Sequence, residues 1–291
     1  MQVTVFGGTG FVGRCLVERL TARGAAVRVV SRRAPRRMTP GAGHLQASIE
    51  DSAAVARAME GADAAVNLVG TTAAKSEREF YAMHRDAPRR MAKAARRAGT
   101  ERFVLVSAMG AAPDAPSAAD RSKAAGEQAV REELADAIIV RPALVYGPHD
   151  HFFARLAPMV QRTAAIPLIG GGRTRFQPIH VEDLADALTR ALDDPQAPGR
   201  DYDLGAEEVF DLRGLIKRLC EALGRRPWLV PVPFALAELA ARLPRAPLTL
   251  DQVRLLRTDK VARPDAARPA ALCVAPRRLA PFLAGYHSRR E

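Results

Sequence analysis

Three glycines near the start of the chain, Gly7, Gly10 and Gly13, have the spacing of a phosphate-binding turn. The apolar run Val3–Phe6 before them predicts a buried strand, and the amphipathic stretch 11–20 after them predicts a helix. Such glycines allow a tight turn, let backbone N–H groups approach a pyrophosphate, and let the helix pack closely on the strand. The helix N-terminus would then present free N–H donors and partial positive charge to the phosphates. This order favours dinucleotide binding over an ordinary strand–helix connection.

A basic stretch follows the second predicted strand, residues 26–30. Ser31, Arg32 and Arg33 come directly after that strand, and no Asp or Glu occurs between Glu18 and Glu50. In NAD sites an acidic residue near this point binds the adenosine ribose hydroxyls, whereas arginine accommodates a 2′-phosphate. The sequence therefore predicts NADPH (NADP) in preference to NAD, with a merely basic surface loop as the alternative.

The first half of the chain must position these groups, and it alternates predicted strands and helices. This pattern indicates a parallel sheet with crossover helices, a doubly wound α/β fold of the Rossmann type. Further strands are expected at 44–47, 64–70, 102–107 and 137–141. Helices are expected from an Asp51 N-cap to about Gly61, over 76–98 with a kink or split at Pro88, and around 121–127.

Ligands of such sheets gather at the carboxyl ends of the strands. We therefore expect the cofactor to contact four further groups of residues besides the arginine loop. These are the turn residues Gly7, Thr9, Gly10, Phe11, Val12 and Gly13; Ser48 and Ile49; Leu68, Val69 and Gly70; and Pro142.

The second half of the chain changes character. Its pattern predicts a glycine-terminated loop at 166–172, a small strand at 176–181, and helices at 182–192, 211–224 and 235–243. We expect a dinucleotide-binding domain at 1–148, rejoined by strand and helix elements from about 176–205. The remainder, 149–291, is expected to form a smaller C-terminal α/β region for substrate or partner binding.

Two segments of this smaller region suggest contacts with other molecules. The apolar segment 227–247 could cover a substrate cleft or dock on a membrane or partner surface. Its apolar residues are Leu229, Val230, Val232, Phe234, Leu236, Leu239 and Leu243. The tail 254–291 carries nine basic and three acidic residues, which suits a solvated face, an acidic partner or an anionic membrane surface.

The composition excludes several classes of function. With 291 residues and 48% apolar residues, the chain can bury a sizeable core. The net charge of +12 is accompanied by only 5% aromatic residues, which argues against a nucleic-acid partner. No apolar run predicts a membrane-spanning helix or a signal peptide, so a cytoplasmic location is expected. Cys15, Cys220 and Cys273 lack metal-ligand spacing and are expected to be reduced, mostly buried thiols, with no metal site.

Several motifs occur in the order of a known family. They are the glycine turn, Asn67–Gly70, Arg121–Glu127, Arg141–Pro148 and Gln177–Leu184. With them the chain resembles the atypical and extended short-chain dehydrogenases/reductases of the NAD-dependent epimerase/dehydratase superfamily. Residues 249–256 and the proline-rich 227–247 region also resemble the branch that contains the short-chain-fold accessory subunit of respiratory complex I.

The resemblance implies where catalytic groups should stand. Active members use a tyrosine four residues before a lysine. The lysine binds the nicotinamide ribose of the cofactor and lowers the tyrosine pKa, so that the phenol can exchange a proton. Lys123 matches the lysine, but Ala119 stands at the tyrosine position. The family serine aligns with Met109, so Ser107, two residues earlier, is the remaining candidate. Tyr146 and Tyr81 are not convincing replacements.

This departure leaves three hypotheses. In the first, NADPH is held tightly in a structural or regulatory role, as resemblance to the complex I accessory subunit implies, with a peripheral position on the inner face of the respiratory membrane. In the second, the protein is a reductase or epimerase acting on a sugar nucleotide or on a quinone- or isoprenoid-related substrate. In the third, it senses the NADPH/NADP ratio and binds another protein.

Overall fold

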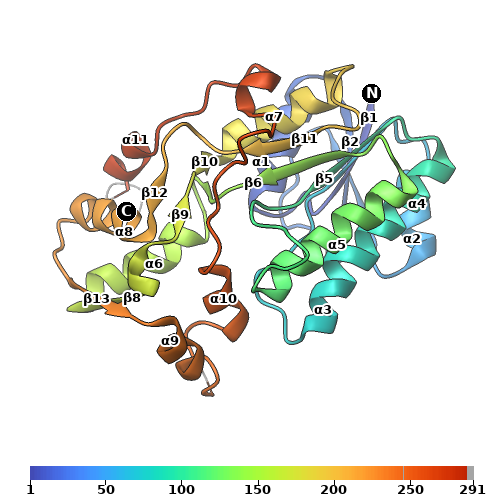
Figure 1. Ribbon diagram of the computed structural model, residues 1–291. Helices are drawn as coiled ribbons and strands as arrows, with labels where there is room; N and C mark the ends of the chain where they lie inside the picture. Colours follow the sequence, from blue (N-terminus) through green and yellow to red (C-terminus); the bar gives the residue numbers. More distant parts are fainter. Residues whose placement is uncertain (245, 287–291) are drawn as a thin grey trace.

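Seven parallel strands form the central sheet of the computed structural model, which describes residues 1–244 and 246–286 (Figure 1). The strand order is β11-β6-β5-β4-β1-β2-β3, which confirms the Rossmann-type α/β fold. The glycine turn leaves the carboxyl end of β1, at the middle of this sheet. The strand bounds are β1 Gln2–Phe6, β2 Ala26–Ser31, β3 Ala42–Gln46, β4 Ala64–Asn67, β5 Arg102–Val106, β6 Ile138–Pro142 and β11 Asp201–Leu204.

Helices cover both faces of the sheet, and each face has its own apolar core. On one face α1 (Phe11–Ala22) packs against α7 (Val181–Asp193) through residues such as Leu16 and Leu188, which are fully buried. On the other face lie α2 (Ser52–Met59), α4 (Ala87–Ala98) and α5 (Ala118–Glu133). The side chain of Asp51 accepts two backbone N–H groups at the start of α2, which confirms its predicted role as a cap.

The predicted helix 76–98 is split, as Pro88 indicated. Its first part is α3 (Glu77–Tyr81), which continues through a π-helical turn, η1 (Ala82–Asp86), into α4. Pro88 lies in the first turn of α4, where its missing N–H is tolerated. The π-helical turn places His84 against Ser122 of α5, so His84 is part of the candidate site described below.

The smaller C-terminal region is built from short strand pairs and helices around a core of its own. The pairs are β7 (Val145–Tyr146) with β10 (Ile179–His180), β9 (Arg175–Phe176) with β12 (Phe210–Asp211), and β8 (Ala165–Ile169) with β13 (Trp228–Val232). The helices are α6 (Phe152–Arg162), α8 (Leu212–Ala222), α9 (Phe234–Ala240), α10 (Leu250–Leu255) and α11 (Leu279–Ala284), with 3₁₀ turns η2 (Gly170–Gly172) and η3 (Pro269–Leu272).

Several local predictions were wrong. The expected loop 166–172 is mostly strand β8, because residues 228–232 pair with it as β13, a partner that the local pattern did not reveal. The expected strand 64–70 ends at Asn67, whose side-chain oxygen accepts the Val69 N–H and turns the chain. The expected single strand at 176–181 is two short strands, β9 and β10.

The C-terminal predictions also need correction. In segment 227–247, four of the seven apolar residues named above are exposed, which does not favour a lid closed over a cleft: Val230, Leu236, Leu239 and Leu243. Cys273 is exposed rather than buried. Arg245 of that segment and residues 287–291 of the basic tail lie outside the described residues. No helix in the described part of the chain is long and apolar enough to cross a membrane.

After α10, residues 257–277 form an extended strap that crosses between the two halves of the molecule (Figure 1). Lys260 makes a β-bridge to Phe176 of β9, and Ala267 makes one to Tyr202 of β11. Arg263 of the strap forms an ion pair with the buried carboxylate of Asp203, with an N–O distance of 2.9 Å. The strap therefore ties the C-terminal region to the edge of the central sheet.

Candidate nucleotide site

The glycine turn has the geometry that close contact with a phosphate requires. Gly7 has a φ of +81°, which disfavours any other residue there, and its carbonyl accepts the Gly10 N–H at 3.0 Å. A Cβ on Gly13 would overlap the Gly7 carbonyl and lie 2.6 Å from the Gly8 Cα. Gly13 therefore lets α1 pack directly against the turn, while Gly10 is exposed at the helix start.

The first turn of α1 offers unsatisfied donors to an anion. Gly10 is the N-cap and has no side chain to occupy the free N–H groups, and no acidic residue lies in the first turn. Phe11 and Val12 are half-buried beside it, as is Thr9 in the turn. The helix dipole and these N–H groups together favour a phosphate at this point.

Ser31 organises the arginine loop after β2. Its hydroxyl donates to the Arg33 carbonyl at 2.7 Å and lies 2.9 Å from the Nε2 of His44. Because the hydroxyl proton goes to Arg33, His44 is the donor in the second contact. Arg32 and Arg33 are exposed, and neither forms an ion pair with a described residue. Two cations are thus free to bind a phosphate beside the end of β2.

The next two strand ends lie at the same edge of the sheet. A Cβ on Gly7 would lie 3.3 Å from the Val69 nitrogen, so the glycine turn and the end of β4 are in contact. Leu68 and Val69 are half-buried and Gly70 is exposed. Ser48 and Ile49 form the turn after β3, with the Ile49 carbonyl bonded to Arg90 at 2.7 Å.

Lys123 belongs to α5, and its side chain reaches the end of β5. Its Nζ donates to the Ser107 carbonyl at 3.3 Å. Burial, with a further contribution from the nearby cation of Lys260, lowers the pKa of Lys123 to about 8. The Ser107 hydroxyl is buried without a hydrogen-bond partner among the described residues. Pro142, at the end of β6, is buried, and its carbonyl accepts the Met109 N–H at 3.0 Å.

These features fit a bound dinucleotide. A Cβ on Gly13 would overlap the backbone of Gly7 and Gly8, so the close approach of α1 to the turn requires glycine at this position. At the same sheet edge, the Ser107 hydroxyl and the Asn67 amide nitrogen are buried polar groups that have no hydrogen-bond partner in the described part of the chain. Unpaired buried donors are rare in folded proteins, and a bound ligand commonly satisfies them. The structure thus brings the residues predicted at the ends of β1, β2, β3, β4 and β6 to one edge of the sheet.

The position four residues before Lys123 is closed by packing. Ala119 is 1% exposed and clusters with Phe80 and Ala118, with Leu255 of α10 packed against them. The carboxylate of Asp251, also on α10, accepts the backbone N–H groups of Ala118 at 2.6 Å and Ala119 at 3.1 Å. The C-terminal region therefore caps α5 at the residue that the family pattern would make a tyrosine.

A second contact from the strap enters the same place. The Lys260 Nζ lies 2.6 Å from the carboxylate of Asp120, and both side chains are largely buried. A Cβ on Gly110 would overlap Lys260, so the ammonium group lies against the loop that follows β5. Sequence reasoning missed Lys260 and Asp251, because each lies more than a hundred residues from its partner.

His84 is a further buried group that the sequence pattern did not reveal. Its Nε2 accepts the Thr71 N–H at 3.1 Å, so its Nδ1 carries the proton and donates to the Ser122 hydroxyl at 2.9 Å. Burial lowers the pKa of His84 to about 3, and the charge of Lys123 contributes. The neutral imidazole therefore joins the loop after β4 to α5, beside Lys123.

The two alternative tyrosines make contacts with other residues. Tyr146 is fully buried, and its hydroxyl donates to the Arg277 carbonyl at 2.9 Å. Burial and the charge of Asp183 raise the pKa of Tyr146, which keeps the phenol protonated. Tyr81 lies on α3 with the Arg85 guanidinium 5.1 Å from its ring centre.

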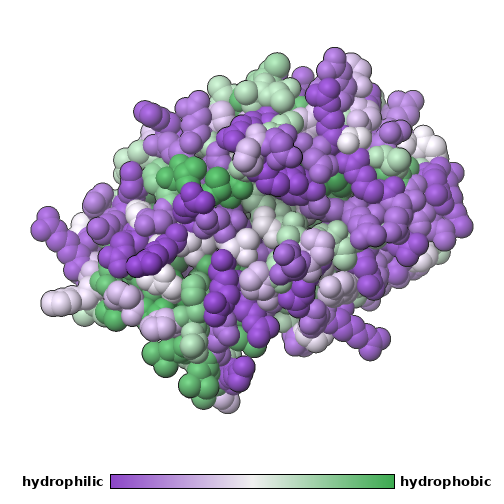
Figure 2. Space-filling view, in the orientation of Figure 1, coloured by the Kyte–Doolittle hydropathy of each residue, from purple (hydrophilic) through white to green (hydrophobic). Residues whose placement is uncertain are grey.

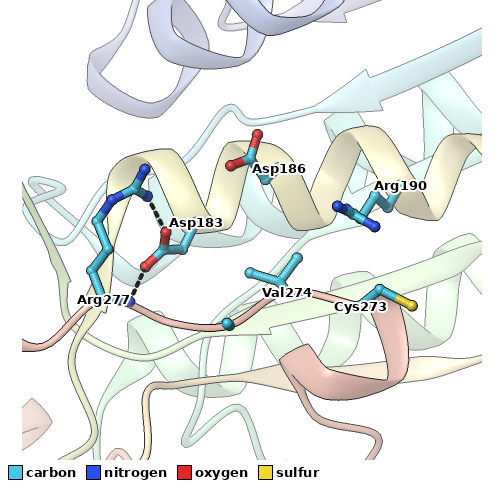
Figure 3. Close-up of a pocket in the computed structure, with 7 residues that line it drawn as sticks. Asp183, Asp186, Arg190, Cys273, Val274 and Arg277 are labelled. Atoms are coloured by element: carbon cyan, nitrogen blue, oxygen red, sulfur yellow. Dashed lines mark hydrogen bonds and ion pairs between the residues drawn. The ribbon is translucent and has the colours of Figure 1, made fainter.

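A surface pocket lies along α7, away from the glycine turn (Figure 3). In it Asp183 accepts the Arg277 backbone N–H at 2.6 Å and pairs with the Arg277 guanidinium. Asp186, Arg190 and Cys273 line the rest (Figure 3). Asp183 and Arg277 already pair with each other, and their contacts hold the strap against α7.

Comparisons with known proteins agree with this fold. The model of the NAD dependent epimerase/dehydratase family matches residues 3–205. The chain is 33% identical to NADH dehydrogenase (ubiquinone) 1 alpha subcomplex subunit 9, mitochondrial, of Arabidopsis thaliana, over 95% of this chain and 74% of that protein. The Mus musculus protein of the same name is 31% identical over 80% of this chain, and the match covers 63% of the mouse protein.

A bacterial relative and two solved structures complete the comparison. The protein named ceramide reductase from Caulobacter vibrioides is 32% identical over 79% of this chain and 73% of that protein. MoeE5 in complex with UDP-glucuronic acid and NAD has a TM-score of 0.79 at 20% identity, covering 100% of this chain and 99% of that one. The dTDP-glucose 4,6-dehydratase DesIV from Streptomyces venezuelae has a TM-score of 0.77 at 20% identity, covering 100% and 98%. At 20% identity, the likeness to these two structures shows that they and this chain share a fold, and no more than that.

Proposed function

The chain belongs to the NAD dependent epimerase/dehydratase family, and we propose that it binds NADPH in a structural or regulatory role without tyrosine-dependent catalysis. The observation that carries this proposal is the state of Ala119. A methyl group stands where the family places a phenol, and Phe80, Leu255 and Asp251 enclose it. A substrate would find neither the proton donor nor the space beside it.

The preference for NADPH rests on charge. Arg32 and Arg33 are exposed and unpaired within the described residues, and the Ser31 hydroxyl fixes the backbone between them. No carboxylate precedes Glu50 on this loop to repel a 2′-phosphate. When bound, the dinucleotide would supply hydride chemistry, while Gly7, Gly10 and Gly13 hold its pyrophosphate and Lys123 its nicotinamide ribose.

A bound nucleotide can stabilise a fold without turnover. A ligand present at about a thousand times its Kd adds roughly 4 kcal/mol to the free energy of unfolding. The relatives named as subunits of NADH dehydrogenase support a partner of the same kind, a respiratory complex I assembly. This proposal places the protein on the cytoplasmic side, as a peripheral protein at the inner face of a respiratory membrane.

A turnover assay tests the catalytic part of the proposal. Purified protein is mixed with NADPH and with sugar nucleotides, aldehydes, quinones and ceramide-type ketones, and NADPH absorbance is followed. We expect no consumption above the background of a Lys123→Ala variant. Substrate-dependent consumption that Lys123→Ala abolishes would contradict the structural role. Co-purification with subunits of a respiratory complex would support the proposed partner.

One observation favours a second candidate function, an NADPH-dependent reductase. The relative named ceramide reductase suggests a lipid carbonyl as the substrate class, beside the sugar-nucleotide or quinone-related substrates that the fold also suits. Lys123 retains its place, and with a pKa of about 8 its ammonium group could deliver a proton near neutral pH. This candidate requires room for a substrate beside Lys123, and therefore a movement of Lys260, which pairs with Asp120 and lies against the loop after β5.

A further inference from the structure

An apolar surface lies on the C-terminal region, on strand β13 and helix α9. Five of the seven large apolar side chains that are exposed in the described residues lie within it; Met1 and Val209 are the other two. The five are Trp228 (79% exposed), Val230 (44%), Leu236 (57%), Leu239 (61%) and Leu243 (65%), and we call them the apolar face. Figure 2 shows the corresponding hydrophobic surface over α9 at the lower edge of the molecule.

Helix α9 is oriented opposite to an ordinary surface helix. Leu236 and Leu239 are three residues apart and therefore share one side of the helix, which faces solvent. Leu243, also exposed, lies in the turn that follows the helix. On its inner side Ala237 is the buried residue, and Phe234 lies beneath the Arg257 guanidinium, 4.3 Å from its ring centre. Arg257 also pairs with Glu238 at 2.8 Å. These inner contacts fix the helix with its leucines outward.

Basic residues surround the apolar face. Arg225 and Arg226 precede β13, and Arg162 precedes the parallel strand β8, so these three lie at one end of the strand pair. Arg242 follows α9, and Arg173 follows the turn after β8. All five are exposed and form no ion pair with a described residue. The only acidic residue in 162–173 and 225–244 is Glu238, whose charge Arg257 neutralises.

We propose that the apolar face docks on a lipid bilayer with anionic headgroups. Trp228 and the three leucines of the apolar face enter the boundary between headgroups and acyl chains, where an indole ring is favoured. The five arginines meet lipid phosphates, which guanidinium groups bind well. A protein surface of mixed charge would be matched by both basic and acidic residues. The apolar face is instead surrounded by arginines, and its single acidic residue, Glu238, is already paired. The inference rests on the proposed membrane-side location and is independent of the bound nucleotide.

The chain contains its own reporter for this contact. Trp228 is the only tryptophan in the sequence, so all tryptophan emission comes from the apolar face. The full chain is titrated with phosphatidylcholine vesicles that contain increasing phosphatidylglycerol, with and without brominated acyl chains. We expect a blue shift, quenching by the brominated lipid, and flotation with anionic vesicles that weakens with salt.

Matched variants separate docking from folding. Leu236→Glu/Leu239→Glu should abolish flotation while leaving the melting temperature and NADPH binding unchanged, because both side chains are exposed. Val209→Glu alters an exposed apolar residue outside the face and should still float. Arg225→Gln/Arg226→Gln should weaken binding to anionic vesicles by about tenfold or more.

Three results would overturn the proposal. The first is an absence of both blue shift and flotation at every lipid composition. The second is concentration-dependent dimerisation that Leu236→Glu/Leu239→Glu abolishes, since a second copy would then cover the face. The third is capture of a protein partner by this face in samples that do not bind vesicles. NADPH affinity is measured on the same samples, so failure of nucleotide binding is scored separately from failure of docking.

Discussion

The carboxylate of Asp251 accepts the backbone N–H of Ala119 at 3.1 Å and that of Ala118 at 2.6 Å. This contact caps helix α5 with a negative charge, which the helix dipole favours. It also holds α10, and with it Leu255, against the position where the family carries its tyrosine. Asp251 therefore helps to close the space around Ala119, the position at which the family has its phenol.

Restoring a tyrosine should not restore catalysis. Ala119→Tyr must fit a phenol into a site that is 1% exposed, so we expect destabilisation by about 3 kcal/mol and no NADPH consumption. Thermal unfolding and the substrate panel measure these effects. Ala56→Tyr, on the exposed side of α2, is the control and should be near neutral. Turnover by Ala119→Tyr would mean that the site opens readily.

Two glycine variants should separate folding from nucleotide binding. Gly13→Ala places a methyl group against Gly7 and Gly8, so we expect the unliganded protein to lose about 3 kcal/mol of stability. Gly10→Ala meets only the Gly7 carbonyl, at 3.3 Å, and should leave that stability nearly unchanged while weakening NADPH binding. Denaturant unfolding and calorimetric titration give the two quantities. Equal binding by Gly10→Ala and the wild type would argue that the pyrophosphate does not approach this turn.

The arginine loop should decide between the two nucleotides. Arg32→Ala and Arg33→Ala each remove a charge-assisted contact to the 2′-phosphate, so we expect NADPH affinity to fall roughly ten- to hundredfold. NADH affinity should change little. Arg97→Ala removes an exposed arginine from the far end of α4 and is the matched control. If the arginine variants reduce NADH and NADPH affinity equally, the loop acts through general charge only.

His84 should give the fold a defined pH dependence. In the unfolded chain its imidazole takes up a proton near pH 6.5, whereas in the folded protein its pKa is about 3. The unfolded state therefore binds more protons between pH 6.5 and 3, and the contribution of neutral His84, complete above pH 6.5, is lost as the pH falls. At pH 5.0 the loss is about 2 kcal/mol.

Urea unfolding of the wild type and His84→Gln at pH 7.5 and pH 5.0 measures this effect. The stability advantage of the wild type should be smaller at pH 5.0, because the variant has no imidazole to protonate. His151→Gln, which alters an exposed imidazole, should follow the wild type at both pH values. An advantage that is the same at both pH values would show that His84 does not titrate as described.

Local patterns in the sequence were sufficient for six of the seven strands of the central sheet, while β11 was expected only as part of the elements returning from 176–205. The glycine turn, the Asp51 cap and the split at Pro88 each depend on residues a few positions apart. The first half of the chain follows such rules because each of its strands is joined to the next by a short crossover. The same patterns brought the turn, the arginine loop and Lys123 to one sheet edge.

The contacts that close the site could not be predicted in this way. Asp251 is 132 residues from Ala119, and Lys260 is 140 residues from Asp120. No periodicity relates residues so far apart, and their pairing depends on where the strap runs in space. Strand β8 was missed for the same reason, since only its partner β13 makes it a strand. In the sequence His84 has no feature that distinguishes it from other helical residues. Its role depends on the π-helical turn, which places it beside Ser122.

The identity of the nucleotide that the purified protein carries tests the central claim most directly. Protein purified without added nucleotide is denatured, and the released material is separated by chromatography and weighed by mass spectrometry. The account predicts NADP(H) in near-stoichiometric amount. Release of NAD(H) alone would contradict it, and so would a protein that carries no nucleotide and shows no rise in melting temperature with NADPH.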